Sequence, residues 1–272
     1  MTTINTNTSA LITQLAMKRN ERDNTKAMEQ LSTGKRINRA ADDASGLAVV
    51  VKMNGTIKGL DQVTRNANDA IAMTETADAA LDGITGILQR MRELATQAAS
   101  DTATNRDMSD TEFQSLKVEL GRIAANTELN DIKLLNGSSA GGFDFQIGTR
   151  RGQTINILIP DFSLTGQLSP VAASGVGSQT GANDSIAQID SAIDNVLSAR
   201  SDVGALVSRL RTTIENLNST TQNAEASRSE ILDADYATAS TELARTQIIQ
   251  QAATAILAQA NMTQQQVLKL LQ

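Results

Sequence analysis

Two segments of the chain place apolar residues at alternating steps of three and four. The first run is Met53, Thr56, Leu60, Val63, Ala67, Ala70, Thr74, Ala77, Leu81, Ile84, Leu88, Met91, Ala95 and Ala98. The second run is Ile186, Ile189, Ile193, Val196, Arg200, Val203, Val207, Leu210, Ile214 and Leu217, in which Arg200 alone is charged. A period of about 3.5 residues keeps an apolar seam facing a partner helix. The two runs therefore predict two long helices that pack on each other.

A shorter segment repeats the same spacing with Phe113, Leu116, Leu120 and Ile123. It follows a polar stretch, residues 100–110, that is rich in residues favoured at helix N-termini. This segment predicts a third helix in the same bundle.

The pattern changes between residues 136 and 183, where Gly and Ser cluster and both prolines occur. Apolar residues now alternate, at Phe143, Phe145 and Ile147 and again at Ile155, Ile157 and Ile159. This alternation predicts a β-hairpin that turns near residues 149–152. Residues 164–181 show little periodicity, so an exposed loop or irregular lobe is expected there, too short for a domain of its own.

The two ends of the chain carry a third pattern. Leu11, Ile12, Leu15 and Ala16, and then Ala27, Met28 and Leu31, flank a charged stretch at residues 18–26. Residues 248–260 are apolar on nearly every helical face, with Gln250, Gln251 and Gln259 as the main polar positions. A helix that is apolar all round is normally buried. The terminal helices therefore need partner helices, which could be other copies of the chain.

Composition narrows the classes of function. The chain has no His, Cys or Trp, one Tyr and four Phe among 272 residues. Without His or Cys, catalysis or metal binding would rest on carboxylates, Lys, Ser or Thr. We therefore expect no enzyme, catalytic residue, cofactor or metal site.

The charge and the apolar segments also exclude some partners. A net charge of −6 and the scarcity of aromatic residues disfavour a nucleic-acid partner. The apolar segments are too short and too rich in Gln for a membrane span of about 20 residues, so no membrane partner is expected. The first 15 residues lack the basic leader and apolar core of a cleaved secretory signal.

Two short motifs have structural interpretations. Ser32 and Lys35 have the spacing of a serine acylase, and Gly34 with Lys35 matches part of a phosphate loop, but the other residues of both motifs are missing. Gly34 instead fits a helix C-terminus, with basic residues near the negative end of the helix dipole. Asp42 and Asp43 are interpreted as an acidic turn before the next helix rather than as metal ligands.

Residues 31–48 run Leu-Ser-Thr-Gly-Lys-Arg-Ile-Asn-Arg-Ala-Ala-Asp-Asp-Ala-Ser-Gly-Leu-Ala. This segment resembles the one that links the two N-terminal helices of bacterial flagellins. Residues 57–60, 65–69 and 88–95 resemble further flagellin segments in the family's order, and residues 145–148 and 152–154 resemble its hairpin. Residues 257–261 and 267–271 resemble its terminal helix. The resemblance covers both ends and most of the interior, leaving residues 164–181 unmatched.

The resemblance implies a mainly α fold: a long antiparallel helical bundle or coiled coil with a small β-hairpin region, and termini that form a second, inner coiled-coil domain. The expected divisions are 1–43 and 228–272 for the inner coiled coil, 44–135 and 183–227 for the outer bundle, and 136–182 for the hairpin and variable loop. The residues expected to pack in the inner coil are Leu11, Leu15, Met28, Leu31, Ile249, Ile256, Leu268 and Leu271.

The resemblance also implies a function. A flagellin is a structural subunit that polymerises into the extracellular flagellar filament for swimming motility, after export in an unfolded state through the flagellar type III apparatus. The expected partners are other copies of the chain, an export chaperone, the filament cap and the hook-junction proteins.

Other functions stay open at this point. A hook–filament junction protein resembles flagellin at both ends, although residues 89–95 and 261–271 favour flagellin. A coiled-coil adaptor inside the cell is an alternative from a different class.

Some flagellins also bind a Toll-like innate immune receptor. The matching positions in this chain are Gln89, Arg90, Glu93, Leu94, Gln97 and Glu112. The same residues could instead serve packing between subunits.

Overall fold

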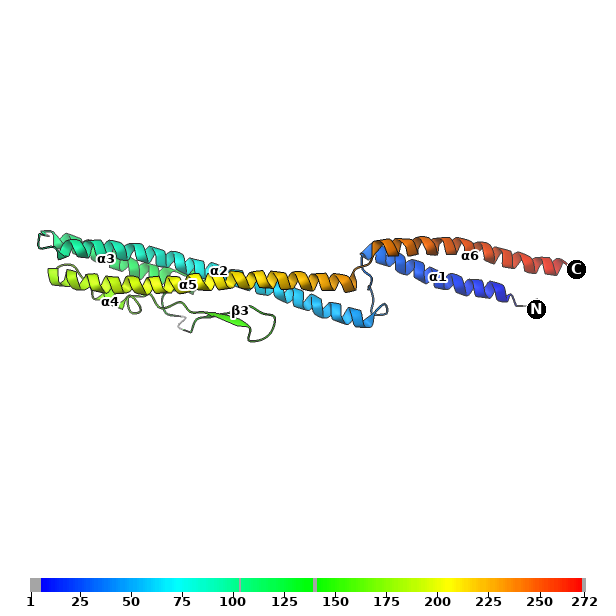
Figure 1. The fold of residues 1–272 in the computed structure, drawn as a ribbon, viewed down its shortest axis with the longest axis horizontal. Helices are drawn as coiled ribbons and strands as arrows, with labels where there is room; N and C mark the ends of the chain where they lie inside the picture. Colours follow the sequence, from blue (N-terminus) through cyan, green and yellow to red (C-terminus); the bar gives the residue numbers. More distant parts are fainter. Residues whose placement is uncertain (1–5, 103, 139–140, 271–272) are drawn as a thin grey trace. The chain divides into compact units, whose positions relative to one another are not determined.

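The heptad segments form long helices in the computed structural model, which describes residues 6–102, 104–138 and 141–270, the last seven of these by their backbone only. The helices are α1 (Thr8–Thr33), α2 (Ala44–Ala99), α3 (Arg106–Asn126), α4 (Ser169–Ala172), α5 (Gln179–Leu232) and α6 (Tyr236–Leu270) (Figure 1). The strands are β1 (Glu128–Leu129), β2 (Ile132–Lys133), β3 (Phe143–Gln146) and β4 (Thr154–Ile157). The chain divides into two compact units, Lys58–Thr221 and Met1–Ile57 with Gln222–Gln272.

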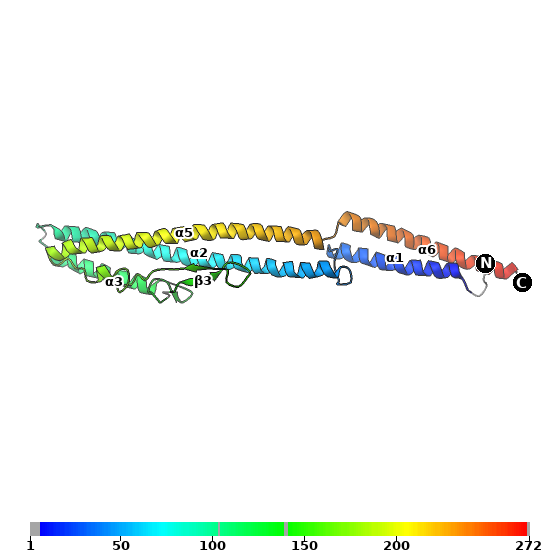
Figure 2. The ribbon, with the colours of Figure 1, turned by 60° about the horizontal axis from the view of Figure 1, so that its bottom comes forward.

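The unit Lys58–Thr221 is a helical bundle. Its portions of α2 and α5 lie side by side with α3 in both views (Figures 1 and 2). Seam residues of α2 are fully buried together with Phe113 and Leu120 of α3 and Ile189 of α5. The predicted helical bundle is therefore confirmed, and its core is the pair of heptad seams covered by the third helix.

Ion pairs along α2 and α5 show that the two helices run in opposite directions. Arg92 pairs with Asp190 at 2.6 Å, Arg200 with Asp78 at 2.9 Å and with Asp82 at 2.7 Å, and Arg211 with Glu75 at 3.3 Å. Pairs that lie farther toward the C-terminus of α5 lie farther toward the N-terminus of α2. Arg200, the charged residue in the second apolar run, reaches the edge of the seam and binds two carboxylates there.

The predicted hairpin is β3 and β4. They pair antiparallel from Phe143 opposite Ile157 to Gln146 opposite Thr154, and the predicted turn lies between them. A second hairpin, β1 and β2, was not expected from the sequence. Its turn residues Asn130 and Asp131 have φ angles of 50° and 64°, as a tight hairpin turn requires.

The expectation of an exposed loop at residues 164–181 is wrong. Leu168, Val171 and Val176 are fully buried, and the segment includes α4 and the first turn of α5. The Lys117 ammonium donates to the carbonyls of Ala172 and Ser174, at 2.9 and 3.1 Å. The sequence misled because isolated apolar residues among Gly, Ser and Gln carry no period, yet Leu168, Val171 and Val176 all join the core of the bundle.

The other unit contains α1 and α6, which lie side by side (Figures 1 and 2). α1 ends at Thr33 and is capped by Gly34, whose φ of 70° is left-handed and whose N–H donates to the carbonyl of Gln30 at 2.9 Å. The predicted helix stop is therefore confirmed. Glycine adopts this conformation without the clash that a Cβ would introduce.

Two connectors meet beside that stop. The segment after α1 pairs with the segment after α5: Arg36 N–H donates to the Leu232 carbonyl at 2.7 Å, and Ala234 N–H donates to the Gly34 carbonyl at 2.9 Å. The acidic turn expected at Asp42 and Asp43 is present. Asp43 accepts the N–H of Gly46 at 2.8 Å, which caps the start of α2.

Candidate interaction surfaces

The interface between α1 and α6 buries small side chains. Among the side chains that the structure describes, the buried apolar residues of the two helices are Ala10, Ala27, Ala239 and Ala253. Eight large apolar residues face outward with 38 to 68 % of their surface exposed: Leu11, Ile12, Leu15, Met28, Ile248, Ile249, Ile256 and Met262. Met17, Leu31, Leu243 and Leu257 are partly buried. Exposed apolar surface on this scale marks an interaction site in a soluble protein.

The residues expected to pack in the inner coil are mostly on that exposed surface. Leu11, Leu15, Met28, Ile249 and Ile256 are exposed, and Leu31 is partly buried. Leu268 lies in α6 at a position where only the backbone is described, and Leu271 lies outside the described residues. Pairing of α1 with α6 in one chain leaves the described members largely uncovered, so their role in packing between chains stays a prediction.

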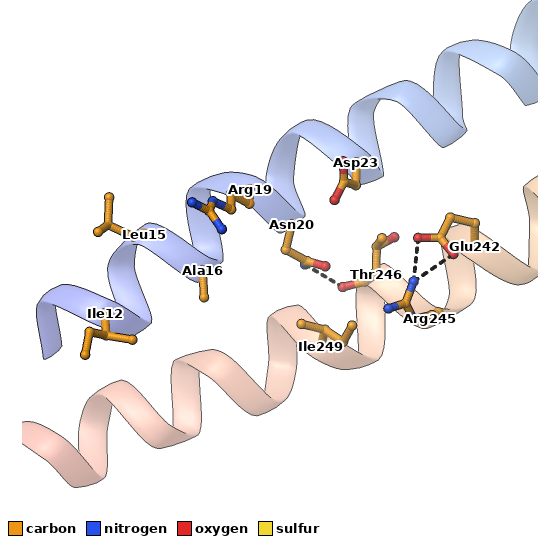
Figure 3. A pocket seen from close by; sticks show the side chains of 10 residues that line it. All are labelled: Ile12, Leu15, Ala16, Arg19, Asn20, Asp23, Glu242, Arg245, Thr246 and Ile249. Carbon is orange, nitrogen blue, oxygen red and sulfur yellow. Dashed lines mark hydrogen bonds and ion pairs between the residues drawn. The ribbon is translucent and has the colours of Figure 1, made fainter. Parts of the chain in front are cut away.

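A groove of about 410 Å³ runs between α1 and α6. Its lining is Ile12, Leu15, Ala16, Arg19, Asn20 and Asp23 of α1 and Glu242, Arg245, Thr246 and Ile249 of α6 (Figure 3). One end is apolar, and the other carries charges of both signs, with Arg245 held by Glu242 of its own helix at 3.0 Å.

Asparagine side chains of α1 bind α6 in this interface. Asn20 Nδ2 donates to the main-chain carbonyl of Thr246 at 2.7 Å (Figure 3), and Asn24 Nδ2 donates to the Thr246 hydroxyl at 3.0 Å. Farther along, Asn7 Nδ2 donates to the Ala260 carbonyl at 3.1 Å. Sequence analysis did not find these residues because residues 18–26 look like a solvated, charged stretch. The available signal was the step of three and four that joins Asn20, Asn24 and Ala27.

A second surface lies on the bundle. Gln89, Arg90, Glu93 and Gln97 of α2 and Glu112 of α3 are exposed, whereas Leu94 is 3 % exposed and packs in the core. The structure brings these residues together, since Arg90 bonds Glu93 at 2.9 Å and Glu112 at 2.9 Å. Hydrogen bonds from Arg90, first to Glu93 and then to Glu112, hold the pKa of the Arg90 guanidinium above its ordinary value. The result is a charged patch that spans two helices.

Across the described residues, no three His, Cys, Asp or Glu side chains come together in a way that could hold a metal ion. In the same part of the chain, every helix is too short or too polar to cross a membrane.

Comparison with known proteins agrees with this architecture. Residues 4–140 match the model of the bacterial flagellin N-terminal helical region, and residues 186–271 match that of the bacterial flagellin C-terminal helical region. A flagellin of Halalkalibacterium halodurans is 41 % identical over 270 residues, covering 98 % of this chain and 99 % of the relative. A flagellin of Bacillus subtilis is 36 % identical with the same coverage of both chains.

A solved structure has a similar fold. It is a putative flagellar hook-associated protein from Vibrio parahaemolyticus, with a TM-score of 0.59 and 15 % identity, covering 71 % of this chain and all of that one. At this identity the likeness concerns the fold alone.

Long helices with large exposed apolar faces mark a helical protein whose surface is suited to contact with other chains. The chain belongs to the bacterial flagellin family. It is a structural protein of the flagellar filament and not an enzyme.

Proposed function

We propose that copies of this chain polymerise through α1 and α6 into a flagellar filament outside the cell, which serves swimming motility. The observation that carries the proposal is the outward orientation of eight large apolar residues of the two helices, 38 to 68 % exposed in a single chain. Burying one Leu or Ile side chain completely contributes about 1.5–3 kcal/mol. Several such residues per subunit supply enough free energy to offset the loss of freedom on association, about 4–15 kcal/mol.

The proposal includes delivery of the chain to the growing filament. The subunit passes unfolded through the flagellar type III apparatus with the help of an export chaperone, and it is added in the presence of the filament cap and the hook-junction proteins. A chain without cysteine has no disulfides to reduce before export. The thin interface of α1 with α6 keeps the terminal helices easy to unfold.

The domain division and the alternative function belong to the same proposal. We assign residues 1–43 and 228–272 to the inner coiled coil, residues 44–135 and 183–227 to the outer bundle, and residues 136–182 to the hairpin region. A role as a hook–filament junction protein is less favoured, because relatives that match over 98 % of the chain are flagellins.

Assembly is tested with Ile256→Asp. Ile256 is exposed, so the variant keeps its bundle folded, whereas burial of the new carboxylate between subunits costs several kcal/mol. Electron microscopy should show filaments from the natural chain and none from Ile256→Asp. Gln251→Asp, which places the same charge elsewhere on α6, is the matched control and should polymerise. Normal filaments from Ile256→Asp would contradict the assignment of this face to assembly.

The patch around Arg90 supports a second, separate role as a contact for a Toll-like innate immune receptor of a host. Gln89, Arg90, Glu93, Gln97 and Glu112 offer exposed polar groups, and Leu94 supports them from the core. Arg90→Ala should weaken receptor binding by roughly tenfold or more, because interface arginines often contribute 2 kcal/mol or more. Arg211→Ala, which also removes an exposed, paired arginine, is the control. Equal binding by both variants would refute this role.

A further inference from the structure

Polar groups are buried where α1 and α6 would be expected to bury apolar ones. Asn20 is 7 % exposed and Thr246 is 1 % exposed, and their buried apolar neighbours in the interface are alanines. Alanines let the helices approach closely, but they resemble one another and do not distinguish one alignment of the helices from another. A polar contact between defined residues can make that distinction.

The two asparagines converge on one residue. Helix carbonyls recur at every residue, so the bond from Asn20 to the Thr246 carbonyl could form in several alignments. The bond from Asn24 reaches the Thr246 hydroxyl, which accepts at 3.0 Å while it donates to the Leu243 carbonyl at 2.8 Å. Within one turn of Thr246 in either direction, α6 offers no other hydroxyl on this face. Both bonds therefore form together only when Thr246 faces the two asparagines.

A shift of α6 by one turn removes both the hydroxyl and the alanine contacts. In the shift that brings Leu243 opposite Ala27, the longer Gln250 side chain replaces Thr246 opposite Asn20, and Asn24 loses the hydroxyl that accepts its hydrogen bond. A partly buried amide that loses its partner is unfavourable, so this shifted alignment is disfavoured. The Asn7–Ala260 bond has nearly the same antiparallel offset as Asn20–Thr246, and this offset places Ala27 opposite Ala239, both buried.

We infer that Asn20 and Asn24, by binding Thr246, are positioning residues that fix the register of α1 against α6. The register decides which large residues of each helix share an exposed face. Leu15 points away from α6 while Ala16 points toward it (Figure 3). This consequence for assembly rests on the proposed function, whereas the register itself rests on the contacts within one chain.

Buried polar residues in coiled coils fix register and lower stability, and apolar replacements often pair more tightly but less specifically. Asn20→Leu combined with Asn24→Leu should therefore keep α1 paired with α6 and allow shifted alignments. Thr246→Val keeps the carbonyl that binds Asn20 and removes the hydroxyl that binds Asn24, so its effect should be intermediate.

Engineered disulfides report the register directly, because the natural chain has no cysteine. The full chain would carry either Ala27→Cys with Ala239→Cys, for the observed register, or Ala27→Cys with Leu243→Cys, for a shift of one turn. Equilibration of the soluble chain in a glutathione buffer gives the relative stability of each disulfide. The natural background should favour the first pair at least about tenfold. Asn20→Leu combined with Asn24→Leu, which removes both bonds to Thr246, should reduce the preference to near unity, and Thr25→Leu, on an exposed face of α1, should leave it unchanged.

Either of two results overturns the inference: equal stability of the two disulfides in the natural background, or an unchanged preference in the variant with both Asn20→Leu and Asn24→Leu. Filament formation by the cysteine-free variants is measured in parallel and separates the two proposals. A natural chain that keeps the preference but never polymerises contradicts the proposed function and supports the register. A chain with both Asn20→Leu and Asn24→Leu that loses the preference and forms irregular or no filaments supports both.

Discussion

The buried apolar residues of the two units differ in size. In the bundle, Leu88 and Phe113 are fully buried among other large apolar side chains. In the pair of α1 and α6, the buried apolar residues are alanines. A large-to-small substitution therefore creates a cavity in the bundle, whereas the terminal pair has little apolar volume to lose.

Leu88→Ala should lower the free energy of unfolding of the bundle by about 2–5 kcal/mol, because it removes buried methyl groups and leaves a cavity. Urea unfolding followed by circular dichroism measures the loss. Val118→Ala is the control, since Val118 is 71 % exposed on α3 and its truncation should change stability by less than about 0.5 kcal/mol. Similar losses for the two variants would mean that α2 does not form the core.

Asp42 makes the connector after α1 sensitive to acid. Its carboxylate accepts the N–H of Arg39 at 3.0 Å and that of Asn38 at 3.2 Å, and Lys26 lies 3.4 Å away. The Arg39 bond first, and then the Asn38 bond and Lys26, lower the pKa of Asp42, against an opposing effect of burial. A lowered folded-state pKa stabilises the fold above the unfolded value, about 3.9, and this stabilisation is lost as the pH falls through the folded-state value.

Hydrogen exchange should show this loss. The amides of Asn38 and Arg39 should keep constant protection from pH 7 to about pH 4 and lose it progressively below. Asp42→Asn should have weaker protection that no longer depends on pH in this range. Constant protection of the natural chain down to the lowest pH would show that Asp42 does not hold the turn.

At the scale of elements, the sequence predicted what periodic burial controls. Leu81 and Ile189 belong to long seams, so helix type and partner were evident, and Phe143 and Ile157 alternate as strand residues do. The β1–β2 hairpin was missed because it is held by two left-handed residues, Asn130 and Asp131, and not by an apolar period. The polar contacts of Asn20 were missed because buried and solvated asparagines look alike in a sequence.

The burial of residues 164–181 was also missed from the sequence, because their apolar residues are not periodic. A deletion measures how much this segment contributes to the stability of the bundle. Deleting residues 172–179 should destabilise the bundle by more than about 3 kcal/mol, because it removes the buried Val176 and leaves Lys117 and Asp110 without main-chain partners. Thermal unfolding measures the change. Substituting the exposed Ala172 and Ala173 by Ser is the control and should be nearly neutral. A deletion variant with natural stability would restore the interpretation of this segment as a free loop.

At the scale of the whole molecule, the two units should differ in local stability before assembly. The bundle has a continuous core of large side chains, whereas α1 and α6 share alanines and a few amide bonds and expose their large apolar residues. Elements with few buried apolar contacts open at a lower free energy than the global value. Limited proteolysis of the soluble chain should therefore cut within α1 and α6 first and leave a fragment close to Lys58–Thr221. Neighbouring copies in a filament should bind α1 and α6 only when these helices are folded. By mass action, the same sites should therefore become resistant to the protease in filaments. The Ile256→Asp chain, which should not assemble, provides the control at the same protein concentration and should be trimmed at the natural soluble rate. Equal resistance of soluble and assembled natural chains would show that α1 and α6 gain no stability from neighbouring copies, and it would contradict the assignment of their exposed faces to the filament.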